Sequence, residues 1–483
     1  MKLTTNILLV TSLFTFSTVA DQADDALQTR LRKTLTDLEA IARQNGDNRA
    51  AGYPGYKASL DYMKSQIDTR FVDSYTTSTQ EFQFQTYNVT LETLQGPDGE
   101  EVVVRTPHWS ANTTGITGSL FDTPVSANGS MCSLSSWDGL DPTGKIAFIQ
   151  RGTCAVSAKV RFAKEKGAIA VIIYNQPSNT TLSMRPSFEF DADRGLLPVG
   201  LITLEVGEAW KQRLAAGEDL KVTLAAQNTV NSVTSWNLFA QSKAGDPNKV
   251  ILSGAHLDSV PEGPGIEDNG SGSAALLEVI DAMSKYTEHE NTLQFAWWGA
   301  EELGLLGSAH YVDTLTEVEA AKLKLYFNYD MVGAIGPDVE FGIQPKNITD
   351  LGPAKRMVAS LEASGAKQYL ADGAGNSDYA PFQAKGFPFV SLYAGGDKTG
   401  ECYHTACDDI TVIGFDTLAL SVKAATYALE GIINSMEGVP PRSSPQLRSR
   451  TVTPARTPKR LAGRNTHAHH AHSSGCAHSA SPI

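Results

Sequence analysis

Four short, almost uninterrupted apolar runs within residues 232–437 constrain the fold of this chain more than any other feature. A strand that is apolar on both faces must be covered by helices on both sides, as in a parallel sheet. Stretches of helical periodicity do lie between the runs, for example from Ser273 to Tyr286. This region therefore predicts a mixed, largely parallel α/β sheet flanked by helices. The four predicted strands are Lys249–Ala255, Leu293–Trp298, Leu325–Tyr329 and Phe387–Tyr393.

The rest of the 483-residue chain divides by changes in sequence pattern, because the chain is too long for one ordinary core. Residues 21–109 begin with two helical stretches, separated by the turn-rich segment Asn48–Gly55, and continue with strand-like alternation. Residues 110–231 combine short strands, turns and one helix without any cluster of catalytic residue types. We expect a separate β-rich module there. Residues 438–483 are rich in Pro, Ser, Arg and His, which is typical of a disordered tail.

The first twenty residues have the pattern of a secretion signal. Lys2 supplies a positive charge, Ile7 to Phe16 is a mostly apolar run, and Thr18 to Ala20 offers small residues for cleavage. The alternative is a retained apolar anchor, but the run is too short to span a bilayer comfortably. We therefore expect a protein that is secreted, or delivered to the lumen of a lytic compartment. No later stretch has the pattern of a membrane span.

Export makes the five cysteines informative, because disulfides persist in oxidising compartments. We expect Cys132 to pair with Cys154 and Cys402 to pair with Cys407, which leaves Cys476 in the tail. The alternative is that some of them are buried thiols. Six Asn-X-Ser/Thr sequons agree with export into a glycosylating environment: Asn88, Asn112, Asn128, Asn179, Asn269 and Asn347.

The charge of the chain is unevenly distributed. The formal net charge is −13, which argues against nucleic acid as a main partner. No acidic residue follows Glu437, so an acidic body carries a basic tail. The seven basic residues of that tail are Arg442, Arg448, Arg450, Arg456, Lys459, Arg460 and Arg464.

Residue types that bind metal ions stand at the ends of the predicted strands, or in the loops that follow them. Sites in α/β sheets form at the carboxyl ends of the strands, so these side chains are expected to converge. Imidazole and carboxylate groups together suit zinc. Each one alone could be a helix cap or a surface residue, but five such accidents at successive strand ends are improbable. The residues are His256, Asp258, Asp268, Glu301, Glu302, Asp330 and His404.

Five of these residues fit two metal ions better than one. Asp268 could bridge two ions about 3.5–4 Å apart. His256 and Asp330 would then serve one ion, and Glu302 and His404 the other. The remaining two residues suggest supporting roles: Glu301 as the group that takes a proton from metal-bound water, and Asp258 as the group that orients His256.

Two other catalytic patterns are absent from the sequence. No His-Glu-X-X-His segment is present, so the single-zinc helix mechanism lacks its residues. Ser271 lies between two glycines, but the surrounding residues do not form the Gly-X-Ser-X-Gly pattern of a nucleophile elbow.

At these residues the sequence resembles the co-catalytic zinc aminopeptidases, a group that includes secreted bacterial aminopeptidases and vacuolar aminopeptidase Y. Residues 110–231 look like the protease-associated domain that is inserted in some members. The matching segments are Gly-Ala-His256-Leu-Asp258-Ser, Pro-Gly-Ile-Glu-Asp268-Asn-Gly-Ser-Gly, Trp-Trp-Gly-Ala-Glu301-Glu302-Leu-Gly, Asn-Tyr-Asp330-Met-Val-Gly and Cys-Tyr403-His404-Thr-Ala-Cys407-Asp.

The resemblance implies a function and a role for each matching residue. It implies two Zn²⁺ per chain, peptide substrates with a free N-terminus, and Glu301 as the base that activates a zinc-bridging water. Tyr403 would donate a hydrogen bond to the developing oxyanion. Cys402 and Cys407 would form a small disulfide around the site, and Met331 and Tyr393 would line the pocket for the substrate side chain.

Two kinds of alternative share parts of this pattern. The ligand set alone does not exclude a carboxypeptidase, a dipeptidase or a glutaminyl cyclase of the same fold. Receptor-like binding proteins have the same pair of domains but lack the ligands, whereas this chain has all five together with Glu301. The preferred N-terminal residue and the oligomeric state are left open by the sequence.

Overall fold

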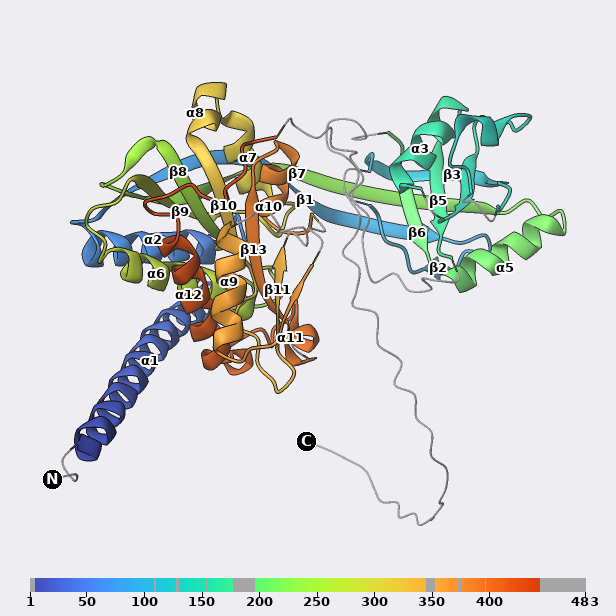
Figure 1. Cartoon of the computed structure of the whole chain (residues 1–483). Helices are drawn as coiled ribbons and strands as arrows, with labels where there is room; N and C mark the ends of the chain where they lie inside the picture. The colour runs from blue at the N-terminus through green and yellow to red at the C-terminus, as the bar shows by residue number, and fades with distance from the viewer. Residues whose placement is uncertain are drawn as a thin grey trace, which may run out of the picture. The chain divides into compact units, whose positions relative to one another are not determined.

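A computed structural model describes residues 5–107, 110–126, 130–152, 154–176, 196–344, 352–371, 375–395 and 397–443 (Figure 1). The chain forms two compact units. Unit 1 combines the chain up to Phe82 with the chain from Ser235 onward, and unit 2 spans Gln83–Thr234. Two long strands, β1 (Tyr75–Gln95) and β7 (Lys221–Ser242), belong to both units. Unit 2 therefore begins before residue 110, where the change in sequence pattern suggested that the inserted module starts.

The sheet of unit 1 is mixed and largely parallel, as the sequence predicts. Its further strands are β8 (Asp246–His256), β9 (Asn291–Trp298), β10 (Leu323–Tyr329), β11 (Glu340–Gln344), β12 (Gln368–Leu370) and β13 (Phe389–Gly395). Their order is β12-β11-β13-β10-β8-β9-β7. The central pairs β13–β10, β10–β8 and β8–β9 are parallel, whereas β7–β9 and β11–β13 are antiparallel. All four predicted strands overlap strands of this sheet.

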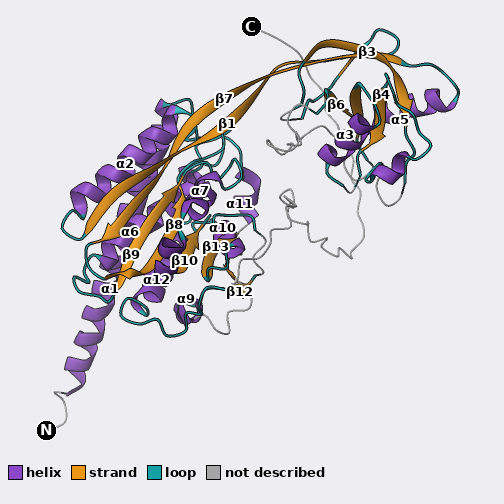
Figure 2. Ribbon diagram, turned by 90° about the horizontal axis from the view of Figure 1, so that it is seen from above, coloured by secondary structure: helices purple, strands orange, loops and turns teal. Residues whose placement is uncertain are grey.

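Helices cover both faces of this sheet, as Figure 2 shows. One group consists of α1 (Thr5–Gln44), α2 (Pro54–Arg70), α6 (Gly272–Met283), α9 (Gly352–Ala363) and α12 (Phe415–Glu430). The other consists of α7 (Leu306–Thr314), α8 (Glu317–Lys322) and α10 (Tyr379–Ala384). The short segments η2 (Ile266–Ser271), α11 (Asp397–Cys402) and η3 (Ile410–Val412) lie in the connections.

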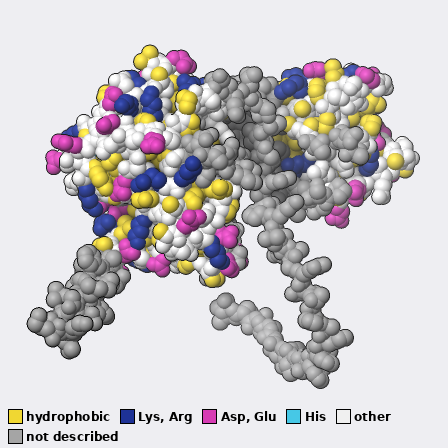
Figure 3. Space-filling view, in the orientation of Figure 1, with side chains coloured by type: hydrophobic (Ala, Val, Ile, Leu, Met, Phe, Trp, Pro, Cys, Tyr) yellow, Lys and Arg dark blue, Asp and Glu magenta, His cyan; other side chains and the backbone are white. Residues whose placement is uncertain are grey.

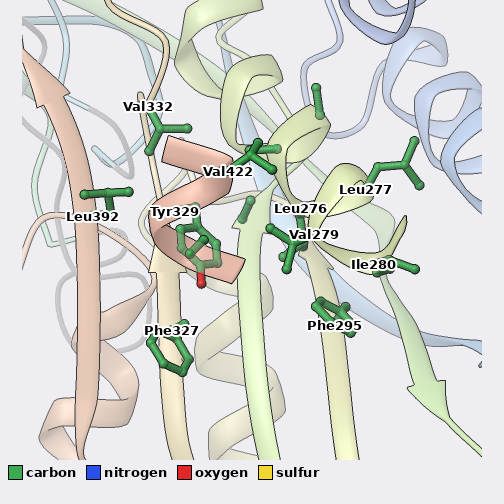
Figure 4. Packing of buried hydrophobic residues seen from close by; sticks show 14 of the residues in the cluster. Leu276, Leu277, Val279, Ile280, Phe295, Phe327, Tyr329, Val332, Leu392 and Val422 are labelled. Atoms are coloured by element: carbon green, nitrogen blue, oxygen red, sulfur yellow. The ribbon is translucent and has the colours of Figure 1, made fainter. Parts of the chain in front are cut away.

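The side chains of β10 show how the strands separate two apolar layers. Phe327 and Tyr329 belong to the same buried cluster as Leu276 of α6 and Val422 of α12, and Figure 4 shows Tyr329 near Val422. Tyr326 points to the other face, where it stacks on Phe382 of α10 at a ring-centroid distance of 3.9 Å. Alternation along a strand with period two produces this division. It also explains why the strands are apolar on both faces.

The two predicted N-terminal helices are confirmed. The chain leaves the helical conformation after Gln44 and resumes it at Pro54, a residue that suits the first turn because it needs no backbone N–H there. Apolar side chains of both helices are buried in the same cluster as the strands of unit 1. They include Leu31, Leu35, Leu38, Tyr56, Leu60 and Met63.

Unit 2 has a smaller sheet with a helix on each face. Its strands are β2 (Glu101–Val102), β3 (Thr113–Asp122), β4 (Ile146–Gln150), β5 (Ala170–Tyr174) and β6 (Val199–Ile202), and its helices are η1 (Leu134–Trp137), α3 (Val156–Glu165) and α5 (Leu204–Ala215). The pairs from β3 to β6 are parallel, and β3 lies antiparallel to β7. The predicted disulfide between Cys132 and Cys154 is present.

The two ends of the chain lie partly outside the described residues. Among the residues that are described, no helix has both the length and the apolar character needed to cross a membrane. The signal peptide expected at residues 1–20 falls where side chains are not described, and most of the tail expected at residues 438–483 also lies outside the described ranges. On the face of unit 1 drawn in Figure 3, basic and acidic side chains are interspersed with hydrophobic ones.

Candidate active site

The predicted metal ligands converge at the carboxyl edge of the unit 1 sheet. His256 is the last residue of β8, and Asp330 directly follows β10. The two glutamates, Glu301 and Glu302, follow β9 after a short turn. Because β8, β9 and β10 are parallel neighbours, their carboxyl ends meet on one side of the sheet. The other two ligands, Asp268 in η2 and His404 after α11, come from loops.

The distances place Asp268 between the two imidazoles. His256 Nε2 lies 3.2 Å from Asp268 Oδ1 and 3.2 Å from Asp330 Oδ1. His404 Nε2 lies 3.2 Å from the other oxygen, Asp268 Oδ2, and 2.9 Å from Glu302 Oε2. Each oxygen of Asp268 thus faces a different histidine. This is the arrangement that a bridging carboxylate between two cations requires.

The donor set fits zinc. Nitrogen and carboxylate oxygen atoms gather within 4.8 Å of one another in two overlapping groups, His256 with Asp268 and Glu302, and His256 with Glu301 and Asp330. Two buried atoms at the site form no hydrogen bond: Glu302 Oε1, and His404 Nε2, which faces two carboxylate oxygens without the geometry of a hydrogen bond to either. Buried polar atoms are normally paired, so a cation bound by these atoms would explain both.

The pKa values of Glu301 and Glu302 show that several carboxylates are crowded together at this site. Burial, and then the neighbouring Asp268, raises the pKa of Glu302 to about 8. Burial also raises the pKa of Glu301 well above its ordinary value, and the nearby carboxylates of Asp378 and Glu302 add to the rise. Divalent cations relieve such repulsion and favour the charged carboxylates. The site is therefore electrostatically suited to bound metal.

Asp258 supports both glutamates and the first histidine. Its carboxylate accepts the backbone N–H of Glu301 at 3.1 Å and that of Glu302 at 3.3 Å. The His256 Nδ1 atom lies 3.1 Å from the backbone oxygen of Asp258 and 3.7 Å from its carboxylate. The imidazole is thus closer to the main chain of Asp258 than to its side chain. The carboxylate acts mainly on the turn that carries the glutamates.

Two further polar residues position ligands, and the sequence alone did not identify them. Asp408 accepts the backbone N–H of Glu267 at 2.7 Å and that of Asp268 at 3.0 Å. Ser377 donates its hydroxyl hydrogen to Asp330 Oδ2 at 2.6 Å. Asp408 ends the resembling segment around His404, and Ser377 lies in Asn376–Phe382, a segment that also resembles the aminopeptidases. That resemblance was the only sequence signal that could have pointed to them.

Arg49 is a third positioning residue that sequence reasoning missed. Its side chain is completely buried, and it donates hydrogen bonds to the backbone oxygens of Leu257, Pro264 and Gly265. These oxygens belong to the segment that connects His256 with Asp268. Arg49 also donates its backbone N–H to Ser259 Oγ at 2.9 Å. Its side chain thus fixes the loop between two metal ligands.

Three non-glycine residues at the site have left-handed backbone conformations. Their φ angles are 58° at Ala300, 53° at Met331 and 58° at His404. Side chains disfavour this region, and residues that adopt it often cluster at active sites. Here they lie before Glu301, after Asp330 and at a ligand itself.

A cavity of about 260 Å³ opens beside the ligands. Met331 and Tyr393, the two expected pocket residues, line it, and so does Tyr403. Tyr403 is 42% exposed and its ring stacks on the imidazole of His404 at a centroid distance of 3.7 Å. The predicted disulfide between Cys402 and Cys407 encloses both residues. The cavity residues are Asp268, Glu301, Glu302, Asp330, Met331, Gln344, Tyr369, Asn376, Ser377, Tyr379, Ser391, Tyr393 and Tyr403.

An α/β sheet with two histidines and several carboxylates at its carboxyl edge, beside a cavity, defines a metal-dependent hydrolase. Comparison with known proteins narrows this class. The sequence matches the model of Peptidase family M28 over residues 237–428 and that of the PA domain over residues 116–210.

Similar curated proteins and similar solved structures are also aminopeptidases. An aminopeptidase of Pseudomonas aeruginosa (strain UCBPP-PA14) is 34% identical over 445 residues, which cover 82% of this chain and 79% of that protein. Aminopeptidase Y of Saccharomyces cerevisiae is 27% identical, with coverage of 89% and 83%. An aminopeptidase from Aneurinibacillus sp. strain AM-1 superposes with a TM-score of 0.69 at 29% identity and coverage of 87% and 98%. The zinc aminopeptidase BSAP from Bacillus subtilis gives 0.62 at 28% identity, with coverage of 84% and 95%.

The chain therefore belongs to peptidase family M28. It is a zinc-dependent metallo-aminopeptidase with a PA domain, so the predicted family, fold class and enzyme class are confirmed.

Proposed function

We propose that this protein is a secreted aminopeptidase that holds two zinc ions per chain and removes single amino acids from the free N-terminus of peptides. The observation that carries the proposal is the position of Asp268, whose two oxygens each lie 3.2 Å from a different imidazole. A single metal ion between one imidazole and Asp268 would leave the other oxygen of Asp268 facing the second imidazole without a cation. His256 and Asp330 would hold one ion, and Glu302 and His404 the other.

Glu301 and Tyr403 supply the proton transfer and the hydrogen bond that the reaction needs in addition to the metal ions. Bound zinc supplies Lewis acidity, which polarises a carbonyl and lowers the pKa of water. Glu301 lies in the cavity with its pKa raised by burial, so it is suited to take a proton from the attacking water and to deliver it to the leaving amine. Burial also raises the pKa of Tyr403, so its hydroxyl keeps its proton and can donate to the developing oxyanion.

Two alternative functions are less well supported: another enzyme of the same fold, and a non-catalytic binding protein. The ligand set alone does not exclude a carboxypeptidase, a dipeptidase or a glutaminyl cyclase, but relatives that cover most of this chain are named aminopeptidases. A non-catalytic binding protein has no need for the five ligands and Glu301, and all of them lie together here.

Secretion and the division of the chain are parts of the same proposal. We propose removal of residues 1–20, a protease-associated domain at residues 110–231 within a peptidase domain formed by 21–109 and 232–437, and a dispensable tail at 438–483. The two disulfides support export. Asn269 would remain unglycosylated despite its sequon, because its side chain is buried and donates to the backbone oxygen of Tyr329 at 2.8 Å.

The test compares leucine p-nitroanilide with its N-acetylated form. We expect cleavage of the free-amine substrate only, and elemental analysis should find two zinc ions per chain. Asp268→Asn should lower zinc content and activity together, because it weakens a ligand shared by both ions. Asp338→Asn, which changes an exposed carboxylate outside the site, is the matched control. Cleavage of the acetylated substrate, or full activity with one bound zinc ion, would contradict the proposal.

A further inference from the structure

One wall of the cavity is polar although the reaction described above does not use it. This wall consists of Gln344 from β11, Tyr369 from β12, and Ser391 and Tyr393 from β13. Strand pairing places them together. Gly342 is in register with both Tyr369 and Tyr393, and Gln344 is in register with Ser391. Alternate residues of a strand share a face, so these four side chains project from the same side of the sheet.

Gly342 allows the ring of Tyr369 to lie across the strand. A Cβ atom added at Gly342 would approach the Tyr369 hydroxyl oxygen to 2.9 Å and its Cζ atom to 3.0 Å. Any side chain at residue 342 would therefore displace the ring. The absence of a side chain there keeps Tyr369 in the cavity wall, in register with Tyr393 across Gly342.

Gln344 brings an unsatisfied acceptor to this wall. Its Oε1 atom is buried and has no hydrogen-bond partner. A buried carbonyl oxygen without a partner costs free energy, so such an atom at a binding site indicates a group that arrives with the ligand. Burial, followed by the effect of Tyr369, raises the pKa of Tyr393 to about 12, so its hydroxyl is neutral at physiological pH. The wall therefore offers aromatic surface and an unpaired acceptor without a formal charge of its own.

We propose that Gln344 makes this enzyme prefer N-terminal residues whose side chain has an apolar stem and ends in a hydrogen-bond donor, either a cationic nitrogen or an amide. The inference rests on the proposed function, because it names the substrate class of the same site. The rings of Tyr369 and Tyr393 and the thioether of Met331 pack against the methylene stem. The Gln344 carbonyl oxygen accepts the hydrogen bond from its end.

Matched substrate pairs test this preference. Lysine and norleucine p-nitroanilides share a stem and differ in the ammonium group, and glutamine and methionine p-nitroanilides are similar in length and differ in the amide. We expect kcat/KM of the parent enzyme to favour the donor member of at least one pair by about 10-fold or more, since one buried hydrogen bond is worth roughly that factor. The pair that shows the preference identifies the donor as cationic or amide.

Two variants connect the preference to Gln344. Gln344→Leu removes the acceptor at similar volume and should abolish the ratio, while methionine and norleucine substrates are still cleaved, which shows that the variant folds. Gln344→Glu should raise the lysine-to-norleucine ratio, because it places a negative charge beside the ammonium group. Gln212→Leu, which makes the same exchange at an exposed residue of α5 in unit 2, is the matched control and should leave all ratios unchanged.

The outcomes separate this inference from the proposed function. Cleavage of norleucine and methionine substrates at the same kcat/KM as their donor partners would overturn the inference and leave the aminopeptidase assignment intact. The same holds if Gln344→Leu keeps the parental ratios. Failure of the parent enzyme to cleave any free-amine substrate would overturn both.

Discussion

Replacement of Arg49 should destabilise the protein and weaken zinc binding, although Arg49 is not a metal ligand. The buried guanidinium donates to three backbone oxygens in the segment between His256 and Asp268. Arg49→Met keeps most of the side-chain length and removes all of these hydrogen bonds. Each buried oxygen left without a partner costs about 1–3 kcal/mol. The guanidinium charge also attracts the carboxylates of Asp408, Asp258 and Asp268, and this attraction is lost as well.

These two costs overlap, because both describe the loss of the same guanidinium. With three oxygens near the lower end of that range, we expect Arg49→Met to lower the free energy of unfolding by about 3–5 kcal/mol, out of a total that is usually about 5–15 kcal/mol. Arg49→Lys keeps the charge, but a single ammonium group lacks the planar fork that reaches several oxygens. Arg49→Lys should therefore lower the free energy of unfolding by less than Arg49→Met does. Substitution of a residue that holds metal ligands in place typically lowers metal affinity by about 10- to 100-fold. The zinc dissociation constants of Arg49→Met should rise by that factor.

Two measurements check this prediction. Urea unfolding of the metal-free proteins gives the stability difference without the contribution of bound zinc. Competition with a chromophoric chelator then gives the zinc affinity of each variant. Arg43→Met is the matched control: Arg43 forms exposed ion pairs with Glu39 and Asp47, which contribute little to stability. If Arg49→Met unfolds within about 1 kcal/mol of the control and binds zinc like the parent, the role assigned to Arg49 is wrong.

Three further predictions concern other parts of the molecule. Glu301→Gln should lower kcat by about 100- to 10,000-fold and keep zinc, whereas Glu302→Gln should lose zinc; metal analysis and kinetics check this, and the reverse result would exchange the two roles. Gly342→Ala should displace Tyr369 and raise KM more than it lowers kcat, which steady-state kinetics on a free-amine substrate can measure; an unchanged KM would contradict it. Burial lowers the pKa of Lys159 to about 8 from an ordinary 10.5. Between these pH values the unfolded chain binds the proton that the folded chain has lost, so stability should rise with pH; urea unfolding at pH 7.5 and 9.5 should show a smaller rise for Lys159→Met than for the parent.

The sequence was most informative where local pattern and chemistry coincide. A buried parallel strand requires a run of apolar residues, so the polar residue that ends the run is conspicuous. His256 and Asp330 were recognisable for this reason, and the structure brings them within 3.2 Å of each other. Asp268 and His404 come from loops, and their proximity depends on tertiary structure. Their residue types made them candidates, and the resemblance to known enzymes supported placing them in the same site.

The positioning residues were not predictable in the same way. Arg49 donates to backbone oxygens, and Asp408 accepts from backbone N–H groups. Such partners are present at every residue, so they leave no pattern of side chains in the sequence. The contacts are also distant along the chain: Arg49 is 210 residues from Ser259, and Asp408 is 141 residues from Glu267. Only the folded structure shows that these segments meet.

The position of Arg49 in the chain has a consequence for how the site is assembled. All five proposed zinc ligands lie between residues 256 and 404, after the segment that forms unit 2, whereas Arg49 precedes that segment. A fragment that starts after unit 2 would therefore contain every ligand but would lack the guanidinium that fixes the loop between His256 and Asp268. It would also lack α1 and α2, whose apolar side chains complete the core of unit 1. The complete site thus depends on the joining of chain segments from both sides of the inserted unit, even though no proposed ligand comes from the first of them.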